Sequence, residues 1–98
     1  MTNPKIKGIE IELNGEKYIC PPLNLNGVEK MQDKLQEFDG LAPFKQLPVV
    51  AEVAHLALIR NYPDLSIESV KDGIDLGNMT TIMNAVMGVS GLVKTEGE

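Results

Sequence analysis

The residues with the clearest potential for catalysis are Glu52 and His55, in the apolar segment 47–62 (LPVVAEVAHLALIRNY). Their i, i+3 spacing places both on one face of a helix, where a carboxylate can orient an imidazole that acts as a general base. No nucleophile or metal ligand accompanies them at a recognisable spacing. We therefore expect a hydrogen-bonded pair on the polar edge of a buried helix and predict that the protein is not an enzyme. A small enzyme using Glu52 and His55 is the alternative.

Residue types that bind metals or carry out nucleophilic chemistry are otherwise sparse. Cys20 is the single cysteine, which excludes an internal disulfide, and with one histidine it gives no zinc-ligand cluster. A free thiol on an apolar face behaves as a small hydrophobe. Residues 64–68 (DLSIE) lack the glycine and the terminal acidic ligand of an EF-hand loop, and the chain has no glycine-rich phosphate loop. We predict neither a cofactor nor a metal site.

The charge of the chain argues against binding to phosphate-rich partners. Nine basic and fourteen acidic residues give a net charge of -5, which repels nucleic acid and anionic membranes. We expect no signal peptide, because residues 1–8 lack an apolar run, and the longest apolar stretch, residues 47–59, is too short to span a bilayer. We expect a single cytoplasmic domain over residues 1–98, with disordered tails at 1–5 and 94–98.

A β-hairpin is predicted near the N-terminus. Residues 9–13 alternate apolar and acidic side chains and run into Asn14-Gly15, the preferred pair for a type I′ turn, so residues 16–20 form the second strand. One face of this hairpin is apolar and should lie on helices, because an isolated hairpin is only marginally stable. That face consists of Ile9, Ile11, Leu13, Tyr18 and Cys20.

The remainder of the chain predicts helices. The spacing of apolar residues indicates a surface helix over 27–39 with Asn26 as its N-cap, a central buried helix over 47–62 and a short helix after Ser66. A fourth helix is expected over 79–89, capped by residues 77–78. The predicted fold class is thus α+β: an N-terminal antiparallel β-hairpin followed by a bundle of about four α-helices, with helix 47–62 at its centre.

Two groups of apolar residues are candidates for binding a partner. Met79, Met83 and Met87 follow one another at i+4 spacing, and flexible thioether side chains adapt to varied apolar surfaces. Filling of the core is the favoured interpretation for Met79 and Met83, whereas Met87 is evenly balanced between core and contact surface. Leu41 and Phe44 lie in a predicted loop over 41–46, which either folds under the domain or forms a contact surface.

Four short segments carry a family resemblance. They are residues 20–25 (CPPLNL), which follow the hairpin, and residues 61–66 (NYPDLS), 74–79 (IDLGNM) and 85–92 (AVMGVSGL). Together they resemble the small tail assembly chaperones of long-tailed bacteriophages and prophages. The segments contain turns and helix caps, and no catalytic residues come with the family.

The resemblance implies a protein of the bacterial host cytoplasm that is absent from the mature virion. Such a chaperone binds and solubilises the tape-measure protein and recruits tail-tube subunits, and in many such families a translational frameshift adds a second domain. We also expect self-association, because many copies are needed to coat a long helix and the hairpin has an edge that can pair with another subunit. A structural tail component, such as a connector or terminator subunit, remains the alternative within the same system.

Overall fold

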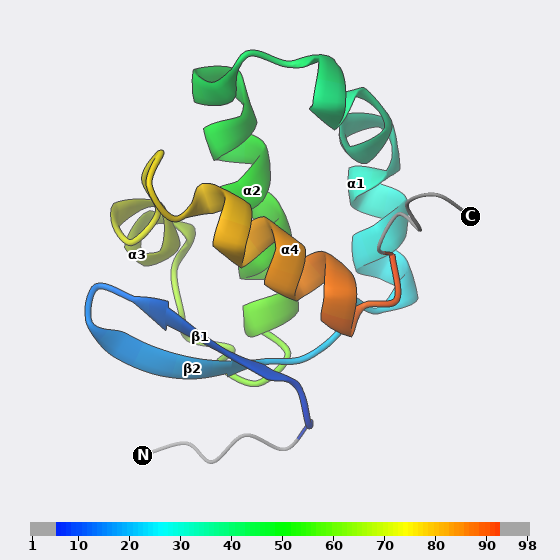
Figure 1. Ribbon diagram of the computed structural model, residues 1–98. Helices are drawn as coiled ribbons and strands as arrows, with labels where there is room; N and C mark the ends of the chain where they lie inside the picture. The colour runs from blue at the N-terminus through cyan, green and yellow to red at the C-terminus, as the bar shows by residue number, and fades with distance from the viewer. Residues whose placement is uncertain (1–5, 93–98) are drawn as a thin grey trace.

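The computed structural model describes residues 6–92 and has a β-hairpin followed by helices, which confirms the predicted α+β class (Figure 1). The helix α2 lies in the middle and packs against α1, α3, α4 and β2, while α4 also packs against β1. The tails expected at 1–5 and 94–98 lie outside the described residues. The elements in chain order are β1 (Ile9–Leu13), β2 (Glu16–Cys20), α1 (Leu25–Glu37), the 3₁₀ helix η1 (Phe38–Gly40), α2 (Pro43–Leu58), α3 (Ile67–Asp72) and α4 (Met79–Val89).

The hairpin has the predicted turn and register. Asn14 and Gly15 both have positive φ, at 54° and 79°, as a type I′ turn requires, and β1 pairs with β2 antiparallel from Leu13–Glu16 back to Ile9–Cys20. The inward-facing Cys20 is fully buried, but Ile9, predicted to be inward-facing as well, is 40 % exposed. Because Ile9 pairs with Cys20, it lies on the predicted face, where it lines a groove between β1 and α4 that leaves it accessible.

The central helix is buried as predicted, but it begins and ends four residues earlier than expected. Pro43, not Pro48, occupies the first turn, where its fixed φ suits a helix start and its missing N–H has no partner to lose. The predicted loop over 41–46 is therefore mostly the first turn of α2. The helix ends at Leu58 because the next backbone bonds tighten, with the Asn61 N–H donating to the Leu58 carbonyl at 3.0 Å.

The first helix also begins earlier than predicted. Its N-cap is Asn24, whose side-chain oxygen accepts a hydrogen bond from the Gly27 N–H at 2.9 Å, so that Asn26 lies inside the first turn. The α-helix then gives way to η1 at Phe38. For α4 the predicted bounds are confirmed, but the Asn78 side chain does not cap the helix. It instead accepts from the Asp75 N–H and donates to the Gly73 carbonyl, both at 2.9 Å.

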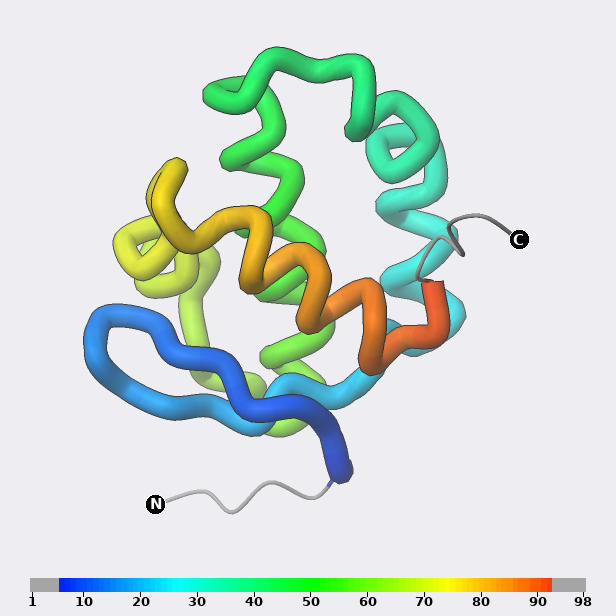
Figure 2. The backbone as a smooth tube through the Cα atoms, in the orientation of Figure 1, coloured from blue at the N-terminus to red at the C-terminus, as the bar shows by residue number. Residues whose placement is uncertain are grey.

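The turn after α2 fastens the hairpin to the helices. Asn61 is 3 % exposed; its side chain bonds both backbone groups of Ile6, at 2.9 and 2.8 Å, and donates to the Ile19 carbonyl at 3.2 Å. The Tyr62 hydroxyl accepts from the Ile19 N–H at 2.8 Å, and its ring meets that of Tyr18 edge-on, with centroids 5.1 Å apart. In Figure 2 this segment passes beside the hairpin. The same residues that end α2 therefore set the position of β2.

The core is aliphatic. Its largest fully buried side chains include Val50, Val53 and Leu58 of α2, together with Val70 of α3 and Val86 of α4. No helix within residues 6–92 is long and apolar enough to cross a membrane.

Candidate functional site: a groove between α1 and α4

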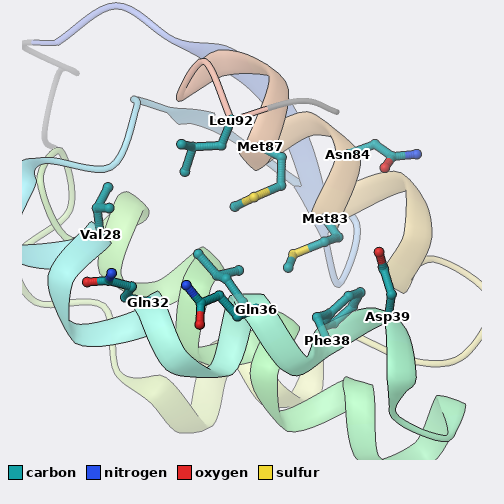
Figure 3. Close-up of a pocket in the computed structure, with 10 residues that line it drawn as sticks. Val28, Gln32, Gln36, Phe38, Asp39, Met83, Asn84, Met87 and Leu92 are labelled. Carbon is teal, nitrogen blue, oxygen red and sulfur yellow. The ribbon is translucent and has the colours of Figure 1, made fainter. Parts of the chain in front are cut away.

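An open apolar groove separates α1 from α4 (Figure 3). Its volume is about 700 Å³. Figure 3 shows Met83 and Met87 pointing from α4 towards α1, with Gln32 and Gln36 on the α1 side and Asn84 pointing away from α1. The apolar lining consists of Val28, Leu35 and Phe38 from the first helical segment and Met83, Met87 and Leu92 from the last.

The C-terminal end of α4 is built so that Leu92 turns back to this groove. Gly91 has a φ of 75°, and two backbone bonds close the end of the helix: the Leu92 N–H donates to the Met87 carbonyl at 2.8 Å, and the Gly91 N–H to the Gly88 carbonyl at 3.2 Å. This pair of bonds is a Schellman motif. In this motif the two residues joined by the longer bond, here Met87 and Leu92, commonly make an apolar contact. Met87 and Leu92 thus form one end of the apolar lining together.

A hydrogen bond joins the two sides of the groove, α1 and α4, near that end. The Leu23 N–H, just before α1, donates to the Ser90 hydroxyl at the end of α4, at 2.9 Å. Figure 2 shows the same proximity in the backbone, where the end of α4 approaches the start of α1. Leu23 itself is buried in the core, so this bond connects the end of α4 to the core beside the start of α1.

The wall formed by α1 rests on α2. The apolar stripe along α1 and η1 consists of Val28, Met31, Leu35 and Phe38, spaced i, i+3, i+7 and i+10. Met31 is 2 % exposed and anchors α1 in the core, whereas Val28 and Leu35 are only half-buried and face the groove. On the other side of α1, Lys34 Nζ lies 2.6 Å from Glu52 Oε1 of α2. The apolar stripe of α1 is therefore divided: Met31 is buried in the core, and its neighbours Val28 and Leu35 form one side of the groove and are partly exposed.

The structure brings together only some of the five predicted contact residues. Met83 and Met87 line the groove; Met83 is 6 % exposed and Met87 is half-buried. Met79 is buried outside the lining, in agreement with core filling. Leu41 is half-buried and Phe44 is 66 % exposed, and neither lines the groove.

Sequence reasoning missed Leu92 and the wall made by Val28, Leu35 and Phe38. The spacing of the α1 stripe was visible, but it indicated burial and gave no sign that α4 would leave the stripe partly uncovered. For Leu92, the signal was Gly91 after an apolar helix, since glycine at that position is typical of a helix end that folds an apolar residue back.

The residues singled out for catalysis have separate structural roles. Glu52 pairs with Lys34, and His55 Nε2 lies 2.9 Å from the Leu65 carbonyl. A carbonyl oxygen only accepts, so the imidazole donates from Nε2 and holds the turn before α3. The expected hydrogen bond between Glu52 and His55 is therefore replaced by bonds to two different elements.

Cys20 and the acidic segment 64–68 are also accounted for by structure. Burial raises the pKa of the Cys20 thiol to about 12, which keeps it protonated and a poor nucleophile at neutral pH. Ser66 caps α3, because its side-chain oxygen accepts from the Ser69 N–H at 3.1 Å. In the part of the chain that the structure describes, no three His, Cys, Asp or Glu residues gather in a way that could hold a metal ion.

Comparison of the chain with models of protein families gives no match, and comparison with curated proteins and with solved structures gives none either. No functional residue is therefore transferred from a relative, and the candidate site rests on the geometry of the groove.

Proposed function

We propose that this protein is a non-enzymatic phage tail assembly chaperone that binds apolar helical segments of a tape-measure protein in the groove between α1 and α4. The observation that carries the proposal is the partly uncovered apolar lining of that groove, with Met87 and Leu92 at its end. Methionine side chains adjust to different apolar neighbours, which suits a client that presents many similar helical segments.

The resemblance of the sequence to tail assembly chaperones supplies the identity of the client. On this proposal the protein acts in the bacterial host cytoplasm, keeps the tape-measure protein soluble, recruits tail-tube subunits and is absent from the mature virion. Self-association belongs to the same proposal, since a long helix needs many copies along its length.

The contacts of Glu52 and His55 favour this proposal over a small enzyme. Glu52 joins α2 to α1 through Lys34, and His55 joins α2 to the turn at Leu65. Both side chains are therefore used to hold helices in place. A His55→Ala variant that still supports tail assembly would remove the enzymatic alternative, and mass spectrometry of purified virions tests the structural alternative, because a connector or terminator subunit stays in the particle.

Co-expression with the tape-measure protein is the direct test. The unmodified chain should form a complex and increase the soluble yield of the client. Met87→Lys places a charge in the apolar lining and should abolish the complex. Thr80→Lys adds the same charge on an exposed part of α4 outside the groove and should leave binding intact. Because neither site is fully buried, far-ultraviolet circular dichroism should show both variants folded.

Two results would contradict the proposal. If the unmodified chain forms no complex with the tape-measure protein, that protein is not its client. A complex that survives Met87→Lys would place the binding surface outside this groove, and on another face of α4 if Thr80→Lys abolishes the complex.

A further inference from the structure

The two edges of the hairpin differ in what covers them. On the outer edge of β2, the Ile19 N–H donates to the Tyr62 hydroxyl and the Ile19 carbonyl accepts from the Asn61 amide. Both backbone groups at this position are therefore occupied by side chains from the turn after α2. A strand from another chain cannot pair there without displacing a buried asparagine.

The pairing register shows which groups of β1 point the other way. In an antiparallel pair, residues alternate between those that bond across the pair and those that face outward. Ile19 faces outward and pairs with Glu10, so Glu10 faces outward on the opposite edge, and Glu12 follows it two residues later. Within residues 6–92 no further hydrogen bond occupies the N–H and carbonyl groups of these two residues, and they form an edge that a further strand can join.

That edge lies beside a second groove. The groove runs between β1 and α4, has a volume of about 740 Å³, and is lined by Glu10 and Glu12 on one side and by Thr81, Ile82 and Ala85 on the other. Figure 1 shows β1 on the side of the hairpin nearer to α4, with β2 on the far side. The five residues of β1 extend over roughly 17 Å, which is the length of an ordinary strand.

We infer that the outer edge of β1 binds an extended segment of a partner protein in which basic and apolar residues alternate. The segment adds a third strand by main-chain hydrogen bonds to Glu10 and Glu12. In an antiparallel pair, directly opposite residues share a face, so basic side chains of the partner lie opposite these two exposed glutamates. The intervening apolar residue faces the side of Ile11, towards the buried Ile82 of α4.

Charge selects this occupant over a second copy of the chain. Two β1 edges paired with each other would bring glutamates into opposition, and like charges at opposed positions destabilise a sheet. The other strand of a second copy is held at its own edge by Asn61 and Tyr62. Lys17, whose Nζ lies 3.5 Å from Glu10 Oε2, shows that a lysine on a neighbouring strand can reach this carboxylate. The inference is independent of the groove between α1 and α4.

The test uses two short synthetic peptides, one alternating lysine with valine and a matched one alternating glutamate with valine. Nuclear magnetic resonance titration of the full chain should show binding of the lysine peptide, with amide shifts confined to β1 and the facing side of α4. The double variant Glu10→Lys with Glu12→Lys should weaken lysine-peptide binding by about tenfold or more and allow the glutamate peptide to bind. The double variant Glu29→Lys with Glu37→Lys makes the same change in net charge on exposed positions of α1 and should leave the preference unchanged.

A further variant tests the main-chain part of the inference. Glu12→Pro removes one outward N–H and none of the bonds between β1 and β2, a position where a strand tolerates proline. It should abolish lysine-peptide binding, while the spectrum of the helices stays unchanged. Binding that survives Glu12→Pro, shifts that fall on α1, or no binding of the lysine peptide would each overturn the inference. Pairing of the unmodified chain with itself through β1, detected as concentration-dependent shifts there, would do so as well.

Discussion

Replacing Asn61 by alanine should test whether one side chain holds the hairpin on the helices. Asn61 is 3 % exposed, and within residues 6–92 its side chain makes three hydrogen bonds to backbone groups, two to Ile6 and one to Ile19. Truncation removes all three at once. It leaves the rest of α2 in place, because Asn61 follows the last helical residue, Leu58.

The magnitude follows from which groups lose their partners. All three bonds are only partly buried and their backbone partners can recover water, so each lost bond costs about 0.5 to 1.5 kcal/mol. The sum is about 3 kcal/mol. Such a loss is a large part of the stability of a small domain, about 5 to 15 kcal/mol, and lowers Tm by about 12 °C or more.

Urea unfolding followed by far-ultraviolet circular dichroism measures this loss. Asn26→Ala is the matched control, because Asn26 is exposed in the first turn of α1 and its replacement should change the free energy of unfolding by about 0.5 kcal/mol or less. Tyr62→Phe should fall between the two, at about 1 kcal/mol, since it removes one bond to Ile19 and keeps the ring contact. If Asn61→Ala costs no more than Asn26→Ala, the hairpin is held by its apolar face alone and the reasoning fails.

Three further predictions concern other local features. Asn24→Ala should lower the free energy of unfolding, measured in urea, by about 1 kcal/mol because it removes the N-cap of α1. An equal loss for Asn26→Ala would instead support the helix start at Asn26 that the sequence predicts. Cys20 should react with iodoacetamide far more slowly in the folded chain than in urea. Because the pKa of its thiol rises on folding from about 9 to about 12, the free energy of unfolding should fall as pH rises through that range. Cys20→Ala should remove this contribution to the pH dependence of stability. Gly8→Ala should destabilise the chain by more than 1 kcal/mol, since a Cβ there would lie 1.9 Å from the Cys20 carbonyl oxygen, whereas Gly40→Ala, with nothing within 4 Å, should be neutral in the same assay.

The hairpin could be predicted almost completely from sequence because its determinants are local. Asn14-Gly15 selects the turn, the turn fixes the register, and alternation of apolar residues fixes the face. The exposure of Ile9 is the exception, since it depends on the tertiary packing of β1 beside α4, for which the sequence has no local signal.

The ends of the helices were predicted less well where the sequence offers two equivalent signals. Pro43 and Pro48 both suit the first turn of a helix, and Asn24 and Asn26 both suit an N-cap. In each pair the structure uses the earlier residue. For α1 the earlier start brings Leu23, whose N–H bonds to Ser90, directly to the end of α4. The choice of N-cap for α1 therefore depends on a contact between residues that are far apart in the sequence, and a local sequence pattern does not contain that contact.

The segments that carry the family resemblance have structural functions that can be separated from binding. In residues 61–66, Asn61 and Tyr62 hold β2, and Ser66 caps α3. In residues 85–92, by contrast, the Schellman motif that ends α4 also turns Leu92 to the groove beside Met87. Substitutions in the first segment should therefore lower stability and client binding together. Met87→Lys should lower binding with stability preserved, so the two kinds of substitution separate residues that hold the fold from residues that bind the proposed client.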